Sequence, residues 1–495
     1  MRTPHPAQQL RRHSGAAVLV FATVSAAAAL ARRQPLSWDE AVTVAVSTRP
    51  VPAVVATLHH SDAVLGLYYL LVHGWGSLLV AVGVHPTESW WRVPSTAAAV
   101  ATCVVVARIA RHRAGPAAGL WAGTVLAVLP LFSFYTVDAR PYTLAALTVV
   151  CAWAVWTEVA RVRRPLLSAT IVVLLLVTAA WLQLFTVLVW PAFALVADRR
   201  SLGRTAAVLV AAAGGVAPLG GVAVHQGSEI GWIPPATVGG VAGVAVHAGG
   251  GLAVTVLLLA LAGYAVRARP SGTHRRTTVA LAWWCCAPIV ALTLLDVVRP
   301  VLVARYVLVS LPMVAVVTGV VVARAAPRPR ASPVRVLGAA LVVAALLTSV
   351  LQDVRPWKYE DYRGAAAFAV HDVAPGTPVL FAPSSARLGF DLYAPPGALR
   401  DLALPEGPGV DPLAIAEEPP PLLREQLASA CRVVLVGDPV GGTADTPGAD
   451  RVKLADVDHW HVDVTAGFGA VTVTVLTDPA CTAHPSPSDG RPHTT

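Results

Sequence analysis

Two adjacent carboxylates, Asp39 and Glu40, follow the first apolar segment of the chain within a few residues. Charged groups at the edge of a membrane helix are costly, so those that persist there usually serve a function. A carboxylate within hydrogen-bond reach of a hydroxyl or an amine can accept the proton that this group loses when it attacks. The acidic pair is therefore the first candidate for a general base.

The loop that holds this pair, about residues 32–62, ends in a second polar group, with His60 and Asp62 shortly before Tyr69. Between the two groups, residues 41–60 have the apolar spacing of a helix that could lie along the membrane surface. The acidic pair and His60 would suffice for base catalysis or for a divalent metal, although no ligand spacing compels a metal. The alternative is an amphipathic connector whose polar residues are merely solvated.

Two arginines outside this loop could bind an anion. Arg140 lies between Asp138 and Tyr142 at the junction of two apolar stretches, and Arg305 opens another stretch together with Tyr306. A guanidinium group binds phosphate or carboxylate through two parallel hydrogen bonds. The alternatives are structural: Asp138 and Arg140 could neutralise each other at a helix end, and Arg305 could extend to the membrane surface.

Composition places all these residues in a membrane protein. Hydrophobic residues make up 55% of the 495 positions and charged residues 13%, which is about half the charged share of a soluble chain. The candidate membrane segments are 15–31, 64–84, 93–109, 117–134, 142–160, 166–182, 183–197, 205–225, 246–266, 278–296, 301–323 and 335–351. Because each is near the length that crosses a bilayer, they predict an all-α polytopic membrane domain of about 11–13 helices over residues 1–352.

The net charge of +9 does not indicate a nucleic-acid partner, because the arginines cluster between apolar stretches, as they do in cytoplasmic loops. We therefore expect a cytoplasmic N-terminus and an extracytoplasmic C-terminal part. The acidic pair and Asp138 are both expected outside, yet three apolar stretches separate them. Since the number of crossings between them must be even, one stretch is expected to be re-entrant or interfacial.

Charged residues, prolines and glycines replace the apolar stretches after residue 352. The change predicts a small soluble α/β domain over 353–484 and a disordered tail over 485–495. Strands are expected at 378–381, 432–437 and 471–476, and helices at 359–370 and 422–429.

The sequence of this predicted domain also contains candidate polar contact residues and two cysteines that could pair. Arg387, Asp391 and Tyr393 could make polar contacts, but we expect them to be ordinary surface residues. Cys431 and Cys481 both fall in the part expected to be outside the cell, where a disulfide could persist. Their pairing remains open at this point.

Several short motifs resemble, in their order along the chain, those of the GT-C superfamily of membrane glycosyltransferases, and most closely the protein O-mannosyltransferases and the lipid A aminoarabinose transferases. The motifs are the acidic pair Asp39–Glu40, His60-Ser61-Asp62, Tyr68-Tyr69, residues 88–95, Asp138-Ala139-Arg140-Pro141-Tyr142, Arg305-Tyr306 with Leu311-Pro312, and residues 357–366 as in actinobacterial mannosyltransferase-like proteins. Two departures occur: Gly66-Leu67 replaces a proline pair, and Asp138 stands where relatives usually have Glu. The resemblance covers about residues 30–370.

The resemblance implies a bacterial plasma-membrane enzyme of GT-C architecture. Such an enzyme transfers a sugar, here expected to be mannose-like, from a polyprenyl-phosphate carrier to a glycan, lipid or protein acceptor at the outer face, with inversion. It implies Asp39 as the base with Glu40 in support, and a divalent metal as an optional cofactor. Fixed cations stabilise the phosphate as it leaves. The implied substrate-binding residues are His60, Asp62, Tyr69, Asp138, Arg140, Tyr142, Arg305 and Tyr306.

Two other classes of protein remain open. A transporter or flippase of lipid-linked or cell-envelope precursors would use glycine-broken helices, such as those at Gly214-Gly215 and Gly249-Gly250-Gly251, although close helix packing explains glycines equally well. A non-catalytic binding protein would recognise a ligand through the soluble domain. It gives no reason for a long acidic first loop.

Overall fold

A computed structural model describes residues 6–159, 165–226, 231, 233–267, 274–325, 332–354, 360–371, 373–405, 417–437 and 448–482. The tail expected at 485–495 lies outside these residues, as do residues 357–359 of the last family motif. The chain divides into two compact units. The first unit comprises 1–33 and 50–354, and the second comprises 34–49 and 355–495. The unit that contains the C-terminal part therefore also includes the acidic pair, together with the rest of residues 34–49.

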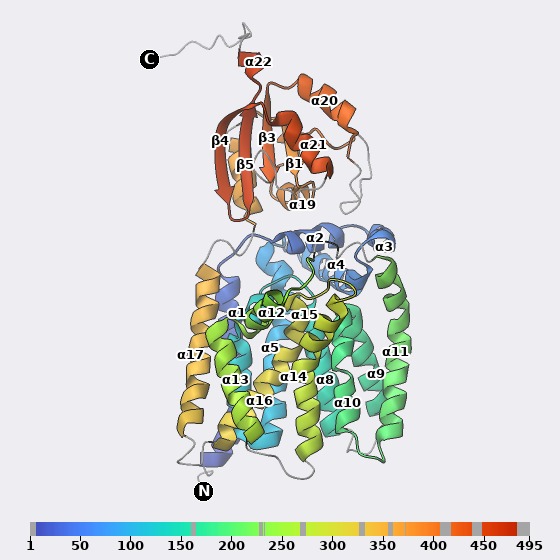
Figure 1. The fold of residues 1–495 in the computed structure, drawn as a ribbon, viewed down its shortest axis with the longest axis vertical. Coiled ribbons are helices and arrows are strands. Elements are labelled where there is room, and N and C mark those ends of the chain that lie inside the picture. Colours follow the sequence, from blue (N-terminus) through green and yellow to red (C-terminus); the bar gives the residue numbers. More distant parts are fainter. Residues whose placement is uncertain are drawn as a thin grey trace. The chain divides into compact units, whose positions relative to one another are not determined.

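The first unit is a bundle of helices (Figure 1). Its helices are α1 Pro6–Leu30, α3 Val51–His60, α4 Gly66–Ala81, α5 Glu88–Ala114, α6 Pro116–Val128, α7 Pro130–Thr136, α8 Tyr142–Ala154, α9 Pro165–Leu182, α10 Pro191–Val196, α11 Leu202–His225, α12 Val238–Gly249, α13 Leu252–Arg267, α14 His274–Asp296, α15 Ala304–Val307, α16 Leu311–Ala325 and α17 Ser332–Val354. Short irregular turns are η1 Ala63–Leu65, η2 Val155–Val159, η3 Leu184–Val189 and η5 Leu308–Ser310.

Within the part of the chain that the structure describes, seven helices are long and apolar enough to cross a membrane. The count rises to nine if two bent pairs are each one span: α6 with α7, bent by 69°, and Val238–Gly249 with Leu252–Ala262, bent by 83°. Three shorter apolar helices accompany them. The predicted fold class is confirmed, and the chain is a multi-pass membrane protein.

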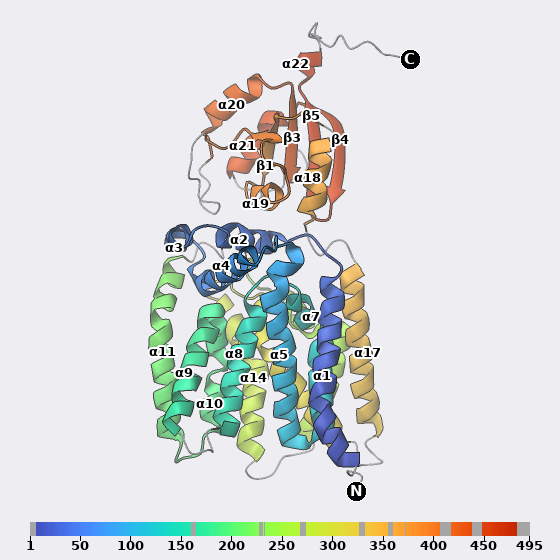
Figure 2. The same ribbon diagram turned by 180° about the vertical axis from the view of Figure 1, so that it is seen from behind.

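The even number of crossings expected between residues 39 and 138 stays a prediction, because α4 with η1 is long and apolar enough to cross, and the bent pair α6 and α7 is either a broken span or a re-entrant loop. Figures 1 and 2 show α4 lying obliquely across the end of the bundle where α3 lies, whereas α5 runs along the bundle. The Tyr68 hydroxyl in α4 lies 2.9 Å from the Ser95 hydroxyl at the start of α5, and that hydroxyl donates to the carbonyl of Arg140 at 2.8 Å. The start of α5 and the loop after α7 therefore meet at one end of the bundle.

Small residues allow the central helices to approach closely. A Cβ atom placed on Gly319 of α16 would come within 2.6 Å of the Ala118 carbonyl oxygen in α6. One placed on Gly119 would lie 2.7 Å from the Ala107 carbonyl oxygen in α5. Because helices in a bilayer gain little from hydrophobic contact with one another, such close backbone packing is a main source of their association.

The second unit contains a five-stranded sheet in the order β2-β1-β3-β5-β4. Strands β1 Thr377–Ala382, β2 Leu399–Asp401 and β3 Arg432–Gly437 are parallel, whereas β5 Val471–Thr477 is antiparallel to β3 and to β4 His461–Phe468. The helices of this unit are α2 Trp38–Ser47, α18 Tyr362–His371, α19 Ala386–Asp391, α20 Pro420–Ala428, α21 Gly448–Val457 and α22 Pro479–Thr482. The α/β prediction is confirmed.

Alternating side chains give this sheet two apolar faces. Leu380 and Leu435 belong to a core with α20 and α21, and Phe381 and Val436 belong to another with α18 and α19. Figure 1 shows α21 in front of the sheet and Figure 2 shows α18 in front of it from behind. Edge strand β4 was not predicted, because five of its first six residues are exposed and carry little hydrophobic signal.

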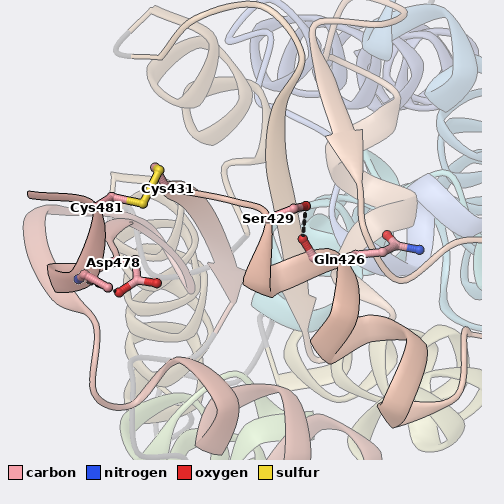
Figure 3. Close-up of a disulfide and its surroundings, with 6 residues drawn as sticks. Gln426, Ser429, Cys431, Asp478 and Cys481 are labelled. Carbon is pink, nitrogen blue, oxygen red and sulfur yellow. Dashed lines mark hydrogen bonds between the residues drawn. A yellow bond between two sulfur atoms is a disulfide. The ribbon is translucent and has the colours of Figure 1, made fainter. Parts of the chain in front are cut away.

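Cys431 and Cys481 form a disulfide, which settles the pairing that the sequence left open (Figure 3). Their Cα atoms are 5.6 Å apart and the bridge joins residues 50 positions apart. Cys431 lies just before β3, and Cys481 lies in α22 just after β5. The bridge therefore fastens the ends of two paired strands.

We expect Cys481→Ser to lower the free energy of unfolding of the second unit by about 2–4 kcal/mol, because the unfolded chain regains the entropy that a closed loop removes. Proteolysis of the full-length protein in increasing urea, read on the C-terminal fragment, measures this loss. Cys286→Ser, at an exposed free cysteine of the bundle, is the control. Equal resistance of all three proteins would contradict the prediction.

Candidate functional site

The acidic pair opens helix α2 through a capping box. The Ser37 hydroxyl accepts from the backbone N–H of Glu40 at 3.3 Å, and the Glu40 carboxylate accepts from the backbone N–H of Ser37 at 3.0 Å. Each side chain thus satisfies a backbone donor that the helix itself leaves open. Glu40 is fully buried, whereas Asp39 is half-buried. The sequence pattern Ser-x-x-Glu is typical of this cap, whereas Glu40 was predicted only as a possible catalytic group.

The expected single helix over 41–60 is two helices, α2 and α3, which belong to different units. The break falls at Thr48–Arg49–Pro50. Proline lacks a backbone N–H and disfavours helical conformation in the residue before it, so the helix ends there. The single-helix prediction was therefore wrong.

Residues before the acidic pair contact the soluble domain of their own unit. The Leu36 backbone N–H donates to the Tyr393 hydroxyl at 2.9 Å. The Trp38 backbone N–H donates to the Glu360 carboxylate at 3.1 Å, and its indole N–H donates to the Ser385 carbonyl at 3.0 Å. Tyr393, expected to be an ordinary surface residue, thus contributes to holding the acidic loop.

At the end of the first unit, Asp62 and Tyr69 are brought together. The Tyr69 hydroxyl donates to the Asp62 carboxylate at 2.6 Å, and Tyr69 is fully buried. Asp62 has a left-handed φ of 55° in the turn between α3 and η1. Gln226 fixes that turn from both sides: its amide accepts from Ala63 and donates to the Leu58 carbonyl, each at 2.9 Å. His60 is exposed at the end of α3.

Three of the predicted residues are buried between α7 and the first residue of α8. Asp138 is 3% exposed, Arg140 7% and Tyr142 5%. The loop between α7 and α8 is attached to α5 through Ser95, whose hydroxyl donates to the Arg140 carbonyl and whose own carbonyl accepts from the Thr143 hydroxyl at 2.8 Å. Because Arg140 is buried and its carbonyl accepts a hydrogen bond from Ser95, its side chain has little freedom to extend to the surface.

A cavity of about 700 Å³ lies beside this loop. Its lining includes Tyr135, the segment 234–237, His247 and the segment 302–305, which ends in Arg305. Tyr142 meets the lining residue Tyr135 edge-on, with ring centroids 4.8 Å apart. Arg305 therefore faces a volume large enough for a ligand, at the same end of the bundle as Asp138 and Arg140.

Asp296 holds two walls of this cavity together. One of its carboxylate oxygens accepts from the backbone N–H groups of Val301 and Leu302 at 2.7 and 2.8 Å, and the other accepts from Ala236 at 2.6 Å. Asp296 is 7% exposed. Irregular backbone at membrane depth requires such partners, because lipid offers none. The role of Asp296 could not be found from the sequence, since Ala236 lies 60 positions away.

Arg305 and Tyr306 open the short helix α15. The Arg305 guanidinium lies 5.9 Å from the centroid of the Tyr306 ring, and that ring packs against Phe185 at 4.8 Å. Tyr306 is thus a support for the arginine. Both side chains are half-buried.

The described residues give no support for the divalent metal that the resemblance allows. Among the described residues, no group of three or more His, Cys, Asp or Glu side chains gathers closely enough to hold a metal ion. Asp39 and Glu40 belong to one unit and His60 to the other, so the three suggested ligands do not form a set within either unit. We therefore derive no step through a metal.

A buried ionic cluster lies at the carboxyl end of β1 in the soluble domain. Arg387, expected to be a surface residue, is 2% exposed and pairs with Asp401 and Glu417. Burial opposes the charge of Arg387, but hydrogen bonds and the charges of these two carboxylates outweigh it and raise the pKa of the guanidinium. Lys453, also 2% exposed, contacts Glu417 at 3.1 Å and Asp450 at 2.7 Å.

The fold of this chain is similar to the folds of solved glycosyltransferases of the GT-C superfamily. The structure of ArnT from Cupriavidus metallidurans in the apo state matches with a TM-score of 0.59 and 12% identity, over 95% of this chain and 99% of that one. The same protein bound to undecaprenyl phosphate matches with a TM-score of 0.59 and 13% identity, over the same shares of the two chains.

An oligosaccharyltransferase from Archaeoglobus fulgidus, in complex with Zn and sulfate, matches with a TM-score of 0.50 and 12% identity, over 84% of this chain and 67% of that one. No family model matches the sequence, and no curated protein matches it. At these identities the similarity establishes the fold alone, and it supports the expected GT-C architecture.

We expect Lys453→Ala to destabilise the second unit by about 3–5 kcal/mol, because the buried Asp450 carboxylate loses the cation beside it and Glu417 keeps only Arg387. Arg424→Ala is the matched control: its ion pair with Asp456 leaves the arginine side chain 57% exposed, and such pairs contribute at most about 1 kcal/mol. Urea-dependent proteolysis of the full-length protein compares the two. A loss no larger for Lys453→Ala than for Arg424→Ala would refute the structural role of the cluster.

Proposed function

We propose that this protein is a membrane glycosyltransferase that transfers a sugar, mannose-like, from a polyprenyl-phosphate carrier to an acceptor, with inversion. The observation that carries the proposal is the cavity of about 700 Å³ faced by Arg305 in a chain with the GT-C fold. Ligand sites combine an apolar wall with a few fixed polar groups, and this cavity does so. A solved protein of the same fold binds undecaprenyl phosphate.

Asp39 is the proposed base. The acceptor hydroxyl or amine attacks the anomeric carbon of the sugar from the face opposite the phosphate, and its proton passes to the Asp39 carboxylate. The bond between the anomeric carbon and the phosphate oxygen breaks with its electron pair, which leaves the polyprenyl phosphate and inverts the anomeric centre. Asp39 is half-buried on a capped helix start, so its position is defined while its side chain stays partly accessible.

In this proposal Glu40 does not take part in the chemistry. It supports Asp39 by holding the start of α2. Its carboxylate closes the capping box and thereby fixes the first turn of α2. A capped turn holds Asp39 in one geometry, and correct geometry is a large part of catalysis. Capping boxes use either Glu or Gln at this position. Glu40→Gln therefore retains an acceptor for the Ser37 N–H and should keep the first turn of α2 in place.

Arg305 and Arg140 are the proposed ligands of the phosphate. Negative charge grows on the phosphate as the sugar leaves, so fixed cations stabilise the transition state more than the ground state. Arg305 faces the cavity with Tyr306 beneath it. Arg140 lies in the loop beside Tyr142, which contacts the lining residue Tyr135.

The remaining predicted residues are proposed to shape the substrate site from the end of the bundle. Asp62 and Tyr69 form a hydrogen-bonded pair, Asp138 and Tyr142 are buried between α7 and the first residue of α8, and His60 is exposed beside Asp62. The partners of the enzyme in this proposal are the lipid-linked donor, a glycan, lipid or protein acceptor, and membrane lipids. The N-terminus is placed in the cytoplasm of a bacterial cell and the soluble domain outside it.

A transporter or flippase of lipid-linked precursors is the second candidate. The bend of 83° between Val238–Gly249 and Leu252–Ala262 favours it, because discontinuous helices line the substrate sites of many transporters. The two candidates differ in chemistry: a transporter moves the lipid-linked sugar and leaves its glycosidic bond intact.

We expect Asp39→Asn to lower sugar transfer by about 10²–10⁴-fold, because the amide cannot accept the proton. The measurement is transfer of radiolabel from polyprenyl-phosphate mannose and related lipid-linked sugars in membranes with matched protein levels. Asp458→Asn, at an exposed aspartate of the same unit, is the control. Equal transfer by wild type and Asp39→Asn would remove the base assignment, and no transfer from any donor would favour the transporter.

We expect Arg305→Gln to lower the transfer rate at saturating donor by about 10²-fold or more, since one cation is removed from the developing phosphate charge. The donor concentration at half-maximal rate should also rise. Arg299→Gln removes an exposed arginine a few residues away and serves as the charge-matched control. If both variants behave alike, the phosphate is bound elsewhere.

A further inference from the structure

We propose that the soluble domain positions the candidate base: Glu360, Ser385 and Tyr393 hold the start of α2 and so fix the location of Asp39. The proposal rests on the proposed function in one respect, which is the role of Asp39 as the base. The docking of α2 is independent of that role, because it is argued from hydrogen bonds and packing. The residues of the docking site are positioning residues, since none is proposed to touch substrate.

The contacts converge on the three residues directly before Asp39. Leu36 donates to Tyr393, and Trp38 donates through its backbone to Glu360 and through its indole to the Ser385 carbonyl. The Trp38 ring also packs against the apolar cluster of α18 and α19. Three hydrogen bonds and a partly buried ring on such a short segment define both the position and the direction in which α2 begins.

Glu360 acts as a second cap for α2. The first backbone N–H groups of a helix have no partner within it and carry partial positive charge. The capping box satisfies Ser37 and Glu40, and the Glu360 carboxylate accepts from Trp38, the first residue of the helix. A charged acceptor makes a stronger hydrogen bond than a neutral one. The helix that bears Asp39 is thus capped partly from the other end of the chain.

The acceptor for the Trp38 indole is itself held by the buried ionic cluster. Lys453 donates to the Ser384 hydroxyl at 2.8 Å, and that hydroxyl donates to Asp450 at 2.8 Å. The Arg387 guanidinium donates to the Ser384 carbonyl at 3.3 Å. Ser385 is the next residue, so the carbonyl that receives Trp38 lies in a loop fixed by buried charges.

The position of this loop in the sheet explains why it serves as a docking site. In the order β2-β1-β3, the strand that follows β1 in the sequence lies on one side of β1. The next strand, β3, lies on the other side. In open α/β sheets, the carboxyl end of a strand at such a switch point is where ligands bind. Here the loop after β1, at 383–385, binds a tryptophan of the same chain.

The test compares a deletion, a conservative replacement and a remote control in the full-length protein. Glu360→Ala removes the acceptor, Glu360→Gln retains an amide oxygen as acceptor, and Trp38→Phe removes the indole donor and keeps a smaller aromatic ring. Asp463→Ala breaks hydrogen bonding to Thr477 at 2.7 Å between β4 and β5 and serves as the control. Two readouts are taken: hydrogen exchange of the amides of 38–47 in detergent, and transfer from polyprenyl-phosphate mannose in membranes.

We expect Glu360→Ala and Trp38→Phe to speed exchange in α2 and to lower the rate at saturating donor by about 10- to 100-fold, since a displaced base loses alignment. The donor concentration at half-maximal rate should change by less than about twofold, because donor binding is untouched. Glu360→Gln should restore most of the rate, and Asp463→Ala should change neither readout.

The outcomes separate this proposal from the proposed function. Unchanged exchange in α2 in Glu360→Ala and Trp38→Phe would overturn the docking, whatever the activity. Faster exchange with an unchanged rate, in a protein that transfers sugar, would overturn the positioning role. If the wild type transfers no sugar from any donor, the proposed function fails, while faster exchange in the two variants would still support the docking of α2 on the soluble domain.

Discussion

Some backbone N–H groups of this protein have no hydrogen-bond partner within a helix or a strand. Where they occur, a carboxylate side chain accepts their hydrogen bonds. Three of them converge on the carboxylate of Asp296, which joins the two loops that line the cavity. Others, at the start of α2, are satisfied by Glu40 and Glu360. An unsatisfied amide away from water costs free energy comparable to a lost hydrogen bond, so these carboxylates are required where they stand.

This dependence changes how the acidic residues are to be understood. Glu40 and Asp296 are buried, and each accepts hydrogen bonds from backbone amides. Asp39, adjacent to Glu40, is half-buried. Two neighbouring carboxylates thus have different surroundings, which is how proteins assign different roles to chemically identical groups.

Much of the fold could be predicted from the sequence, because its signals are local. Apolar stretches near bilayer length located the membrane helices, and buried strands such as Val433 to Val436 are continuous apolar runs. The candidate site was predicted less completely, since its supports are distant in sequence. Trp38 and Glu360 are 322 positions apart, and Trp38 and Ser385 are 347 apart. The break at Pro50 and the capping box, by contrast, were local signals that the helical spacing of 41–60 concealed.

The composition of the second unit, with residues 34–49 added to the C-terminal part, has a consequence for biosynthesis. Ribosomes add about 5–20 residues per second. Glu360 therefore leaves the ribosome roughly 16–64 s after Trp38, from the 322 positions between them. During this interval the membrane helices can already be made, while α2 still lacks its external cap. Completion of the acidic helix start therefore follows the synthesis of the membrane helices, because it can occur only after residue 360 has been made.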